Sequence, residues 1–377
     1  MKILFITNNL PPIVDGVGDY TYNIATQFAK HNHEVYIICR NDSRINTNVL
    51  GMTILPIIDK WNYNCYKHIT DFIQEKAIDA VSLQYVPHGF HSKGLPFPII
   101  KLTKEIKRSN AKLFTFFHEV SVEKEKGNIK RTILSMLMQH LSKRIIENSD
   151  YIATSIEYYR NMILRLVPDK KEITLIPIAS NIPETKLSKE ELFDLKKTLA
   201  PNDETIISFF GIRNIQTSID AISELKENGQ KLKVQLIGKT SKHLPNNLPT
   251  DTIKTGTLDI EEIDQYLKIS DIFILPENND AGCSFKSGSF ATGLRNNLPI
   301  ITTKGKLTSK ELCNQDNILF CDFTNSNEIK ERILYLIDCL HKNKILNNKI
   351  HYTDWNDTYN TYINIINNHG CNICYKQ

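Results

Sequence analysis

The chain alternates between short apolar runs and longer segments with apolar residues at helical spacing. The apolar runs of the first half are mostly continuous, as in parallel strands that are buried on both faces. Between them, Ile129–Glu147 is predicted to be a helix, with Ile133, Leu137, Leu141 and Ile145 at four-residue spacing. This alternation predicts an α/β fold with a doubly wound parallel sheet. The predicted strands are Lys2–Asn8, Glu34–Cys39, Thr53–Ile57, Ala80–Val86, Leu113–His118, Tyr151–Thr154 and Ile173–Ile178.

The alternation pauses at Ser180–Ser188, a polar segment with a proline, which we interpret as a linker between domains. A second series of strands and helices follows and predicts a second domain. We therefore expect domains over residues 1–180 and 181–350, with residues 351–377 forming a helix that packs back on the first domain. Two such domains are expected to face a cleft at the carboxyl ends of their strands. The second series comprises Ile206–Gly211, Lys233–Gly238, Ile253–Gly256, Ile272–Pro276, Ile300–Thr303 and Ile318–Cys321.

Composition fits two soluble domains. The 377 residues are 41% hydrophobic and 23% charged, which is ordinary for a globular protein of this length. No apolar run approaches the roughly 18 residues needed to span a bilayer, and the sequence from Met1 enters a strand directly. With eight scattered cysteines, these features predict a cytoplasmic protein. The pair Cys371 and Cys374 has no second pair beside it, so we predict no metal site.

The net charge of +4 is concentrated in the first half. Residues 1–180 hold 23 basic and 17 acidic side chains, and most of the excess lies between Lys101 and Arg144. Interleaved glutamates make this segment unlike a nucleic-acid groove, so we expect no nucleic-acid partner. Two interpretations stay open: a solvated helix surface, or a face that contacts anionic lipid headgroups on the inner side of a membrane.

Small residues follow the first predicted strand. Gly16 and Gly18 would let a ligand approach the backbone at the start of a helix, and Asp19 is a suitable N-cap. The glycines are wrongly spaced for a dinucleotide fingerprint. The alternative is a glycine turn with a capping aspartate.

Histidines follow two other strands of the first half. His118 ends the strand Leu113–His118, where an imidazole can act as a general base toward a sugar hydroxyl, and Glu119 could orient it. His88 also follows a strand and is expected to shape the wall on the acceptor side, as is Asp19. A histidine that is merely hydrogen-bonded at the surface is the alternative for His118.

The second half contains a candidate anion site. The stretch Leu275–Thr303 runs from a strand through a polar loop into a helix, whose N–H groups and dipole would attract a diphosphate near Gly288 and Ser289. Lys286 adds a cation there, and Arg213 could bind phosphate oxygens as a fork. Leu258 is placed to contact a base. The alternative is an ordinary strand–helix turn with surface cations.

These motifs resemble a GT-B glycosyltransferase of the large family-4 type. The resemblance rests on the Gly16/Gly18 loop, LQYVPHGF, FFHE, PIASNIP, FFGIR and NNLPIITT, and it covers nearly the whole chain. It implies two Rossmann-like domains, an acceptor side in the first, a nucleotide-sugar site mostly in the second, and neither a cofactor nor a metal. It also implies that His118 lies near the acceptor and the transferred sugar.

The chain departs from the family pattern at charged positions. The two glutamates that the family usually carries are replaced by Ser284 and Thr292, and its usual lysine by Thr217. The segment from Ser284 to Ser289 resembles a Ser-x-Lys/Arg-x-Gly-Ser loop of one branch of the family, in which Lys286 would supply the missing cation.

The leading hypothesis is therefore a glycosyltransferase that moves a sugar from a nucleotide-sugar donor to a carbohydrate or lipid-linked acceptor of a surface glycan. The resemblance suggests a retaining reaction. A non-catalytic scaffold with a degenerate donor site is the alternative, because three charged family positions are neutral here. A nucleotide-sugar epimerase of the same fold is a third hypothesis, although no carboxylates for proton abstraction could be placed.

Overall fold

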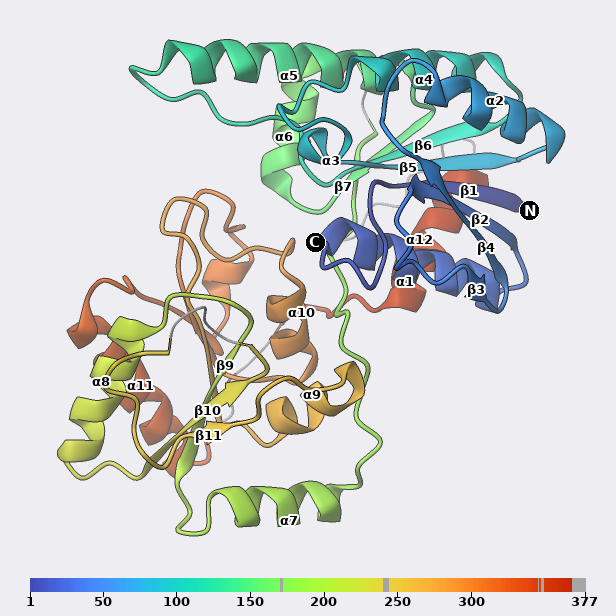
Figure 1. Cartoon of the computed structure of the whole chain (residues 1–377). Helices are drawn as coiled ribbons and strands as arrows, with labels where there is room; N and C mark the ends of the chain where they lie inside the picture. Colours follow the sequence, from blue (N-terminus) through green and yellow to red (C-terminus); the bar gives the residue numbers. More distant parts are fainter. Residues whose placement is uncertain (170–171, 240–243, 345, 347–348, 368–377) are drawn as a thin grey trace. The chain divides into compact units, whose positions relative to one another are not determined.

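The computed structural model describes the chain except for residues 170–171, 240–243, 345, 347–348 and 368–377. The paired cysteines Cys371 and Cys374 therefore lie outside the described residues. The chain forms two compact units (Figure 1). The first comprises Met1–Ile178 and Thr353–Gln377, and the second comprises Ala179–Tyr352.

The first unit is built on an eight-stranded sheet with the order β3-β4-β2-β1-β5-β6-β7-β8. Neighbouring strands are parallel except for β3 and β4, which are antiparallel. The chain moves outward from β1 to β2 and β4, and then returns to place β5 on the other side of β1. The strands are β1 (Lys2–Ile6), β2 (Glu34–Arg40), β3 (Asn48–Val49), β4 (Met52–Ile58), β5 (Ala80–Tyr85), β6 (Lys112–Phe117), β7 (Tyr151–Thr154) and β8 (Thr174–Leu175).

Helices cover both faces of this sheet. The helices α2, α4 and α5 pack side by side on one face, while α1 packs against α12 on the other (Figure 1). The helices are α1 (Gly16–Lys30), α2 (Cys65–Glu75), α3 (Pro87–Phe90), α4 (Phe97–Arg108), α5 (Ile129–Asn148), α6 (Glu157–Leu166) and α12 (Trp355–Asn367). This arrangement confirms the doubly wound sheet that the strand–helix alternation predicted.

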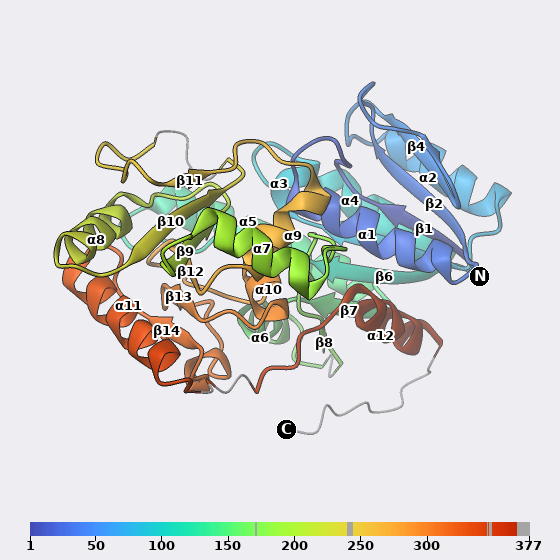
Figure 2. The same cartoon turned by 90° about the horizontal axis from the view of Figure 1, so that it is seen from below.

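The helix α12 belongs to the core of the first unit, although it follows the whole second unit in sequence (Figure 2). Its Tyr362 is fully buried, and its ring centroid lies 4.3 Å from that of Phe114. The Tyr362 hydroxyl lies 3.3 Å from that of Tyr20 on α1. The helix therefore completes the apolar layer between α1 and the sheet.

The second unit has a six-stranded parallel sheet with the order β11-β10-β9-β12-β13-β14. One apolar core lies under α8 and α11, and another lies under α9 and α10. The strands are β9 (Thr205–Phe210), β10 (Leu232–Ile237), β11 (Ile253–Lys254), β12 (Ile272–Leu275), β13 (Ile300–Thr302) and β14 (Ile318–Phe320). The helices are α7 (Lys189–Leu199), α8 (Gln216–Glu227), α9 (Ile260–Lys268), α10 (Gly288–Arg295), the 3₁₀ turn η1 (Leu312–Asn314) and α11 (Ser326–His341).

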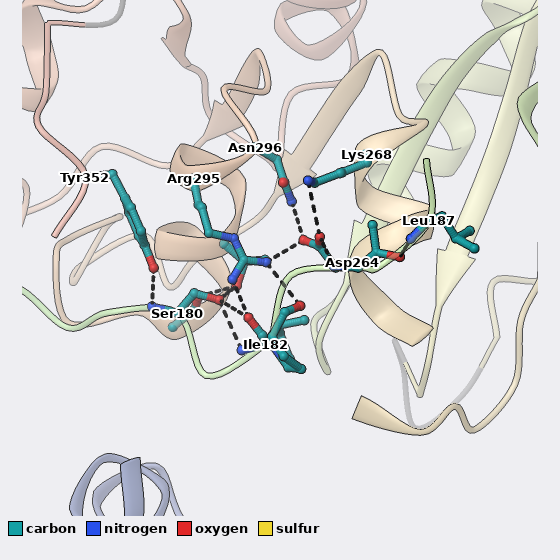
Figure 3. Close-up of polar contacts among 12 residues, drawn as sticks. Ser180, Ile182, Leu187, Asp264, Lys268, Arg295, Asn296 and Tyr352 are labelled. Atoms are coloured by element: carbon teal, nitrogen blue, oxygen red, sulfur yellow. Dashed lines mark hydrogen bonds and ion pairs between the residues drawn. The ribbon is translucent and has the colours of Figure 1, made fainter. Parts of the chain in front are cut away.

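A buried carboxylate fastens the segment that was interpreted as a linker (Figure 3). Asp264 on α9 is fully buried and forms an ion pair with Arg295 on α10. Asn296 donates to the same carboxylate at 2.9 Å, and so does the backbone N–H of Thr185, also at 2.9 Å. Arg295 additionally donates to the carbonyl of Ile182. This cluster of contacts therefore holds residues 182–185 against the middle of α9 and the C-terminal end of α10.

The beginning of the same segment is also fixed. The N–H of Ser180 donates to the Tyr352 hydroxyl at 3.0 Å, and the Ser180 and Thr292 hydroxyls lie 2.7 Å apart (Figure 3). The chain passes from the first unit to the second just before this segment, and the first half of Ser180–Ser188 is anchored within the second unit. Its polar side chains find buried partners in the second unit, which a polar sequence alone does not reveal.

Candidate functional site

Most of the predicted site residues follow strands that border the position where the strand order reverses, while His118 and Glu119 follow β6 and Leu258 follows β11. In the first sheet this position lies between β1 and β5, and in the second it lies between β9 and β12. Open α/β sheets bind ligands beside the carboxyl ends of the strands at such switch points, because the loops diverge there and leave room. The two groups of residues are described separately, unit by unit.

The loop after β1 leads into α1, which begins at Gly16. The N-cap is Asp15, whose side chain accepts from the N–H of Val17 at 3.0 Å and from Asn9 at 2.9 Å. The prediction that Asp19 is the N-cap is therefore wrong, since Asp19 lies in the first turn of the helix. Both aspartates are compatible with the cap rules, and only the backbone conformation distinguishes them.

The two glycines of this loop have different roles. A Cβ on Gly18 would lie 2.7 Å from the carbonyl oxygen of Asn9, so only glycine lets the helix pack against the loop. A Cβ on Gly16 would meet nothing within 4 Å. Gly16 is also exposed and forms the first residue of α1, where backbone N–H groups have no partner within the helix. There is space beside Gly16 for the close approach of a ligand, and Gly18 is required for packing; the predicted contact of both with a donor stays a prediction.

Burial, and to a smaller extent the neighbouring Asp15 carboxylate, raises the pKa of Asp19 to about 6. The usual value for this carboxyl is 3.8. Carboxyl groups that titrate near neutrality are enriched at functional sites, because they can exchange a proton at working pH. The sequence placed Asp19 on the acceptor side without indicating this shift.

We expect Asp19 to make folding stability depend on pH. Because the pKa of Asp19 is higher in the folded than in the unfolded chain, its contribution is full below about pH 3.8 and is lost as the pH rises through about 6. The variant Asp19→Asn lacks this titration. Its free energy of unfolding, measured in urea between pH 4 and pH 7, should therefore rise relative to that of the original chain. A difference that stays constant with pH would contradict the assignment.

His118 lies one residue beyond β6 and is 8% exposed. Its Nε2 lies 2.9 Å from Oε1 of Gln84, which is fully buried on the neighbouring strand β5. The His118 ring also contacts Tyr20 on α1, with a centroid distance of 5.0 Å. The imidazole therefore follows β6, one strand from the switch point, and is held against β5 and α1, which border that point.

A chain of buried polar groups orients the Gln84 amide. Its Nε2 donates to the hydroxyl of Ser82 at 2.8 Å and to that of Tyr362 at 3.4 Å. With the amide nitrogen turned this way, Oε1 accepts from His118, so Nε2 of His118 carries a proton. In the neutral ring Nδ1 is then the basic nitrogen. Tyr362 on α12 is thus connected to the His118 imidazole through the Gln84 side chain.

The other predicted residues of the first unit lie at different depths. Glu119 follows His118 and is half-buried, whereas His88 is exposed on α3. His91 terminates that short helix, and its Nδ1 accepts from the N–H groups of Lys93 and Leu95. His91 therefore stabilises a turn.

In the second unit the predicted anion site coincides with the start of α10. The helix begins at Gly288, and the Ser287 side chain caps it by accepting from the N–H of Phe290. The N–H groups of Gly288 and Ser289 belong to the first turn, where the helix dipole favours an anion. The backbone conformation predicted for this stretch is therefore present.

The loop after β9 reaches the same helix start. Gly211 has φ +85°, a backbone conformation that favours glycine. A Cβ built on Gly211 would lie 3.4 Å from Oγ of Ser289. Arg213 folds back over Gly211, donates to the carbonyl of Phe210 at 2.7 Å, and forms a 2.9 Å ion pair with Glu277. Glu277 follows β12, so this ion pair bridges the switch point of the second sheet. The structure thus brings Arg213 and Ser289 together, with the guanidinium already engaged by a carboxylate.

The remaining predicted residues surround this point at different depths. Lys286 is half-buried in the loop before α10, and Ser284 is buried in the same loop. Leu258 is half-buried and packs on the core under α9 and α10. Asn181 was not predicted, and its amide nitrogen lies 3.8 Å from a Cβ built on Gly288. Its carboxamide oxygen is buried and has no hydrogen-bond partner among the described residues.

Two family models match the sequence. The model described as Glycosyltransferase Family 4 matches residues 14–179, and that described as Glycosyl transferases group 1 matches residues 194–351. The chain belongs to the family-4, group 1 type of GT-B glycosyltransferases. The family recognition, the fold class and the enzyme class predicted from the sequence are therefore confirmed.

Solved structures show the same fold at low sequence identity. A glycosyltransferase from Rickettsia africae ESF-5 is 17% identical, with a TM-score of 0.62 over 97% of this chain and 93% of that one. Alr3699/HepE from Anabaena, in complex with UDP, is 11% identical, with a TM-score of 0.63 over 97% and 96%. Sucrose-phosphate synthase from Thermosynechococcus elongatus is 12% identical, with a TM-score of 0.61 over 90% of both chains. The curated proteins contain no match to the sequence.

Three residues that contact the predicted positions of this glycosyltransferase were missed. Glu277 directly follows the buried strand β12, so its place after a strand was a usable signal. Gln84 and Asn181 lie within the motifs LQYVPHGF and PIASNIP, but an amide within an apolar run or a polar segment gave no sign of its individual role. Over the described part of the chain, no group of three or more His, Cys, Asp or Glu residues is placed to hold a metal ion.

Proposed function

We propose that this glycosyltransferase moves a hexose-type sugar from a nucleotide-sugar donor to a carbohydrate or lipid-linked acceptor in the synthesis of a surface glycan. The observation that carries the proposal is the start of α10, where Gly288 and Ser289 lie beside Gly211 and Arg213 at the switch point of the second sheet. Backbone N–H groups, a helix dipole and a guanidinium favour a diphosphate. The complex of Alr3699/HepE with UDP supports a donor of this class.

Arg213 has a definite part in this proposal. Its ion pair with Glu277 holds the guanidinium rigidly at the edge of the sheet, with little of its side chain exposed. A positively charged group that is fixed before the donor binds loses little conformational freedom on binding. The amide of Asn181 and the ammonium of Lys286 would add donors toward the same anion.

On the first unit, we propose that His118 acts beside the transferred sugar and the acceptor hydroxyl. Its support is the oriented imidazole beside β5 and α1, next to the switch point, with Nδ1 as the basic nitrogen of the neutral ring. Asp19 and Glu119 would lie on the acceptor side, and Gly16 would admit the donor phosphate or sugar. We further propose a retaining reaction without a cofactor or metal, in the cytoplasm and on the inner face of the membrane.

Calorimetric titration of the purified chain with UDP, GDP, ADP and dTDP tests the donor site. We expect saturable binding of one of them, and a loss of about tenfold or more in affinity for Lys286→Ala, as for a lost hydrogen bond between charged groups. The matched control is Lys342→Ala, because Lys342 is an exposed residue of the same unit that follows α11.

Failure of all four nucleotides to bind would favour the non-catalytic scaffold. One observation gives that alternative some weight. Thr292, which stands where the family usually has a glutamate, is fully buried, and its hydroxyl lies 2.7 Å from that of Ser180. This position therefore serves the fold of the second unit.

A further inference from the structure

The helix α5 exposes large apolar side chains in its first half. Ile129 is 75% exposed, Ile133 52%, Met136 56% and Leu137 41%. Successive helical residues are about 100° apart, so these four side chains lie on one stripe of the helix. Single exposed apolar residues are ordinary, whereas a contiguous stripe marks a surface that contacts something.

The opposite side of α5 fixes this orientation. Ser135 and Ser142 donate to the carbonyls of Val122 and Val120 at 2.7 Å each, and Leu141 and Ile145 are buried. The four-residue spacing that predicted the helix advances by about 400°, so the apolar series drifts by about 40° at each step. The series therefore begins on the outer face and ends in the core. The apolar stripe is a consequence of this drift. It stays on the outer face because the buried side of α5 fixes how the helix is rotated about its axis.

Basic residues precede the stripe and continue along α5 and the neighbouring helix. Lys124 and Lys126 lie in the exposed segment before α5, and Lys130, Lys143 and Arg144 are exposed on the helix. The adjacent helix α4 packs along α5 (Figure 1) and adds three exposed lysines. These lysines are Lys101, Lys104 and Lys107.

Carboxylates also lie on this face, and most are engaged locally. Glu125 pairs with Arg131 at 3.6 Å, and Glu147 pairs with Arg144 at 2.9 Å. On α4, Glu105 pairs with Arg108 at 2.9 Å. Glu123, in the segment before α5, accepts a hydrogen bond from the Tyr158 hydroxyl. From Lys101 to Glu147 the chain has 11 basic and 5 acidic side chains, so this segment keeps a positive balance.

We infer that α5 and its flanking lysines form a docking surface for an anionic lipid bilayer. Apolar side chains on the outer face of a helix can enter the boundary between headgroups and acyl chains, while the nearby lysines attract anionic headgroups. Dispersed lysines on a convex helix face suit a fluid, negatively charged surface, since no groove is needed to position a rigid partner. This inference rests on the proposed membrane location, which it assigns to named residues, and is independent of the donor.

Sedimentation with lipid vesicles tests the docking surface. We expect the chain to bind vesicles of phosphatidylcholine with phosphatidylglycerol at low salt. Binding should be much weaker to phosphatidylcholine alone, and weaker at about 0.5 M salt, where charge interactions are screened. The double variant Ile133→Ser/Met136→Ser and the double variant Lys126→Glu/Lys130→Glu should each lower the bound fraction, the second by about tenfold or more.

The matched control is Leu334→Ser/Tyr335→Ser, which removes two exposed apolar residues of α11 in the second unit and should leave binding unchanged. Equal binding by the original chain and the α5 variants would overturn the inference. So would a dimer in light scattering that Ile133→Ser/Met136→Ser dissolves, because a second copy would then cover the stripe. Nucleotide titration of the same variants separates this outcome from failure of the proposed donor site.

Discussion

Replacing His118 by alanine is expected to lower sugar transfer by roughly 100-fold while leaving nucleotide binding almost unchanged. The reason is the separation of tasks between the units. His118 is positioned by Gln84 in the first unit, whereas the diphosphate groups proposed for the donor are positioned by α10 in the second. The measurement is release of nucleoside diphosphate from the sugar donor of whichever nucleotide binds, together with calorimetric titration of that nucleotide.

A second histidine provides the control for this prediction. His68 is exposed on α2, and His68→Ala should retain full transfer. Unchanged transfer in His118→Ala would remove the imidazole from the mechanism. A parallel loss of nucleotide binding would instead indicate that the substitution disturbs the fold.

The largest expected effect on stability is that of Asp264→Ala, which should lower the free energy of unfolding of the second unit by about 3–5 kcal/mol. The substitution leaves the Arg295 guanidinium in a nearly buried position without its carboxylate, and it removes the acceptor of the Thr185 N–H. Loss of one partner from a buried ion pair is costly because the other charge stays desolvated.

The two tryptophans make this prediction specific to one unit. Trp61 and Trp355 both lie in the first unit, so tryptophan fluorescence reports on that unit, whereas far-ultraviolet circular dichroism reports on both. Asp264→Ala should shift the dichroism transition in urea more than the fluorescence transition. The control Asp338→Ala removes an exposed ion pair with Lys342 and should cost less than about 1 kcal/mol. An unchanged dichroism transition would show that the cluster contributes little.

The sheets of this protein could be predicted because buried parallel strands leave an unambiguous signal. A short, continuous apolar run such as Leu113–His118 fits few structures other than a buried strand. Each predicted strand is present among the described residues. The two-residue strand β3 was missed, since Asn48 and Val49 carry no apolar run. β8 is shorter than its predicted run, Ile173–Ile178, because only two of its residues pair with β7.

The candidate site was predictable where backbone conformation determines it. The start of α10 at Gly288 follows from local turn and cap residues, which act over a few positions. The ion pair of Arg213 with Glu277 joins residues 64 positions apart, and the contact of Gln84 with Tyr362 joins residues 278 apart. Such contacts depend on strand order, which apolar patterns do not specify. The Asp19 pKa was equally inaccessible, because burial is its main cause.

The return of α12 to the first unit has a consequence for biosynthesis. During translation the strands and most helices of the first unit leave the ribosome early, yet Tyr362 is made only after the entire second unit. Until then the apolar surfaces of Tyr20, Phe114 and Phe116 lack the ring that covers them in the finished fold. The second unit is contiguous in sequence and can fold while the first waits. A nascent chain interrupted before α12 would therefore expose an apolar surface that is prone to aggregation. A fragment designed to isolate the first unit must for this reason carry residues 353–367 fused behind residue 178.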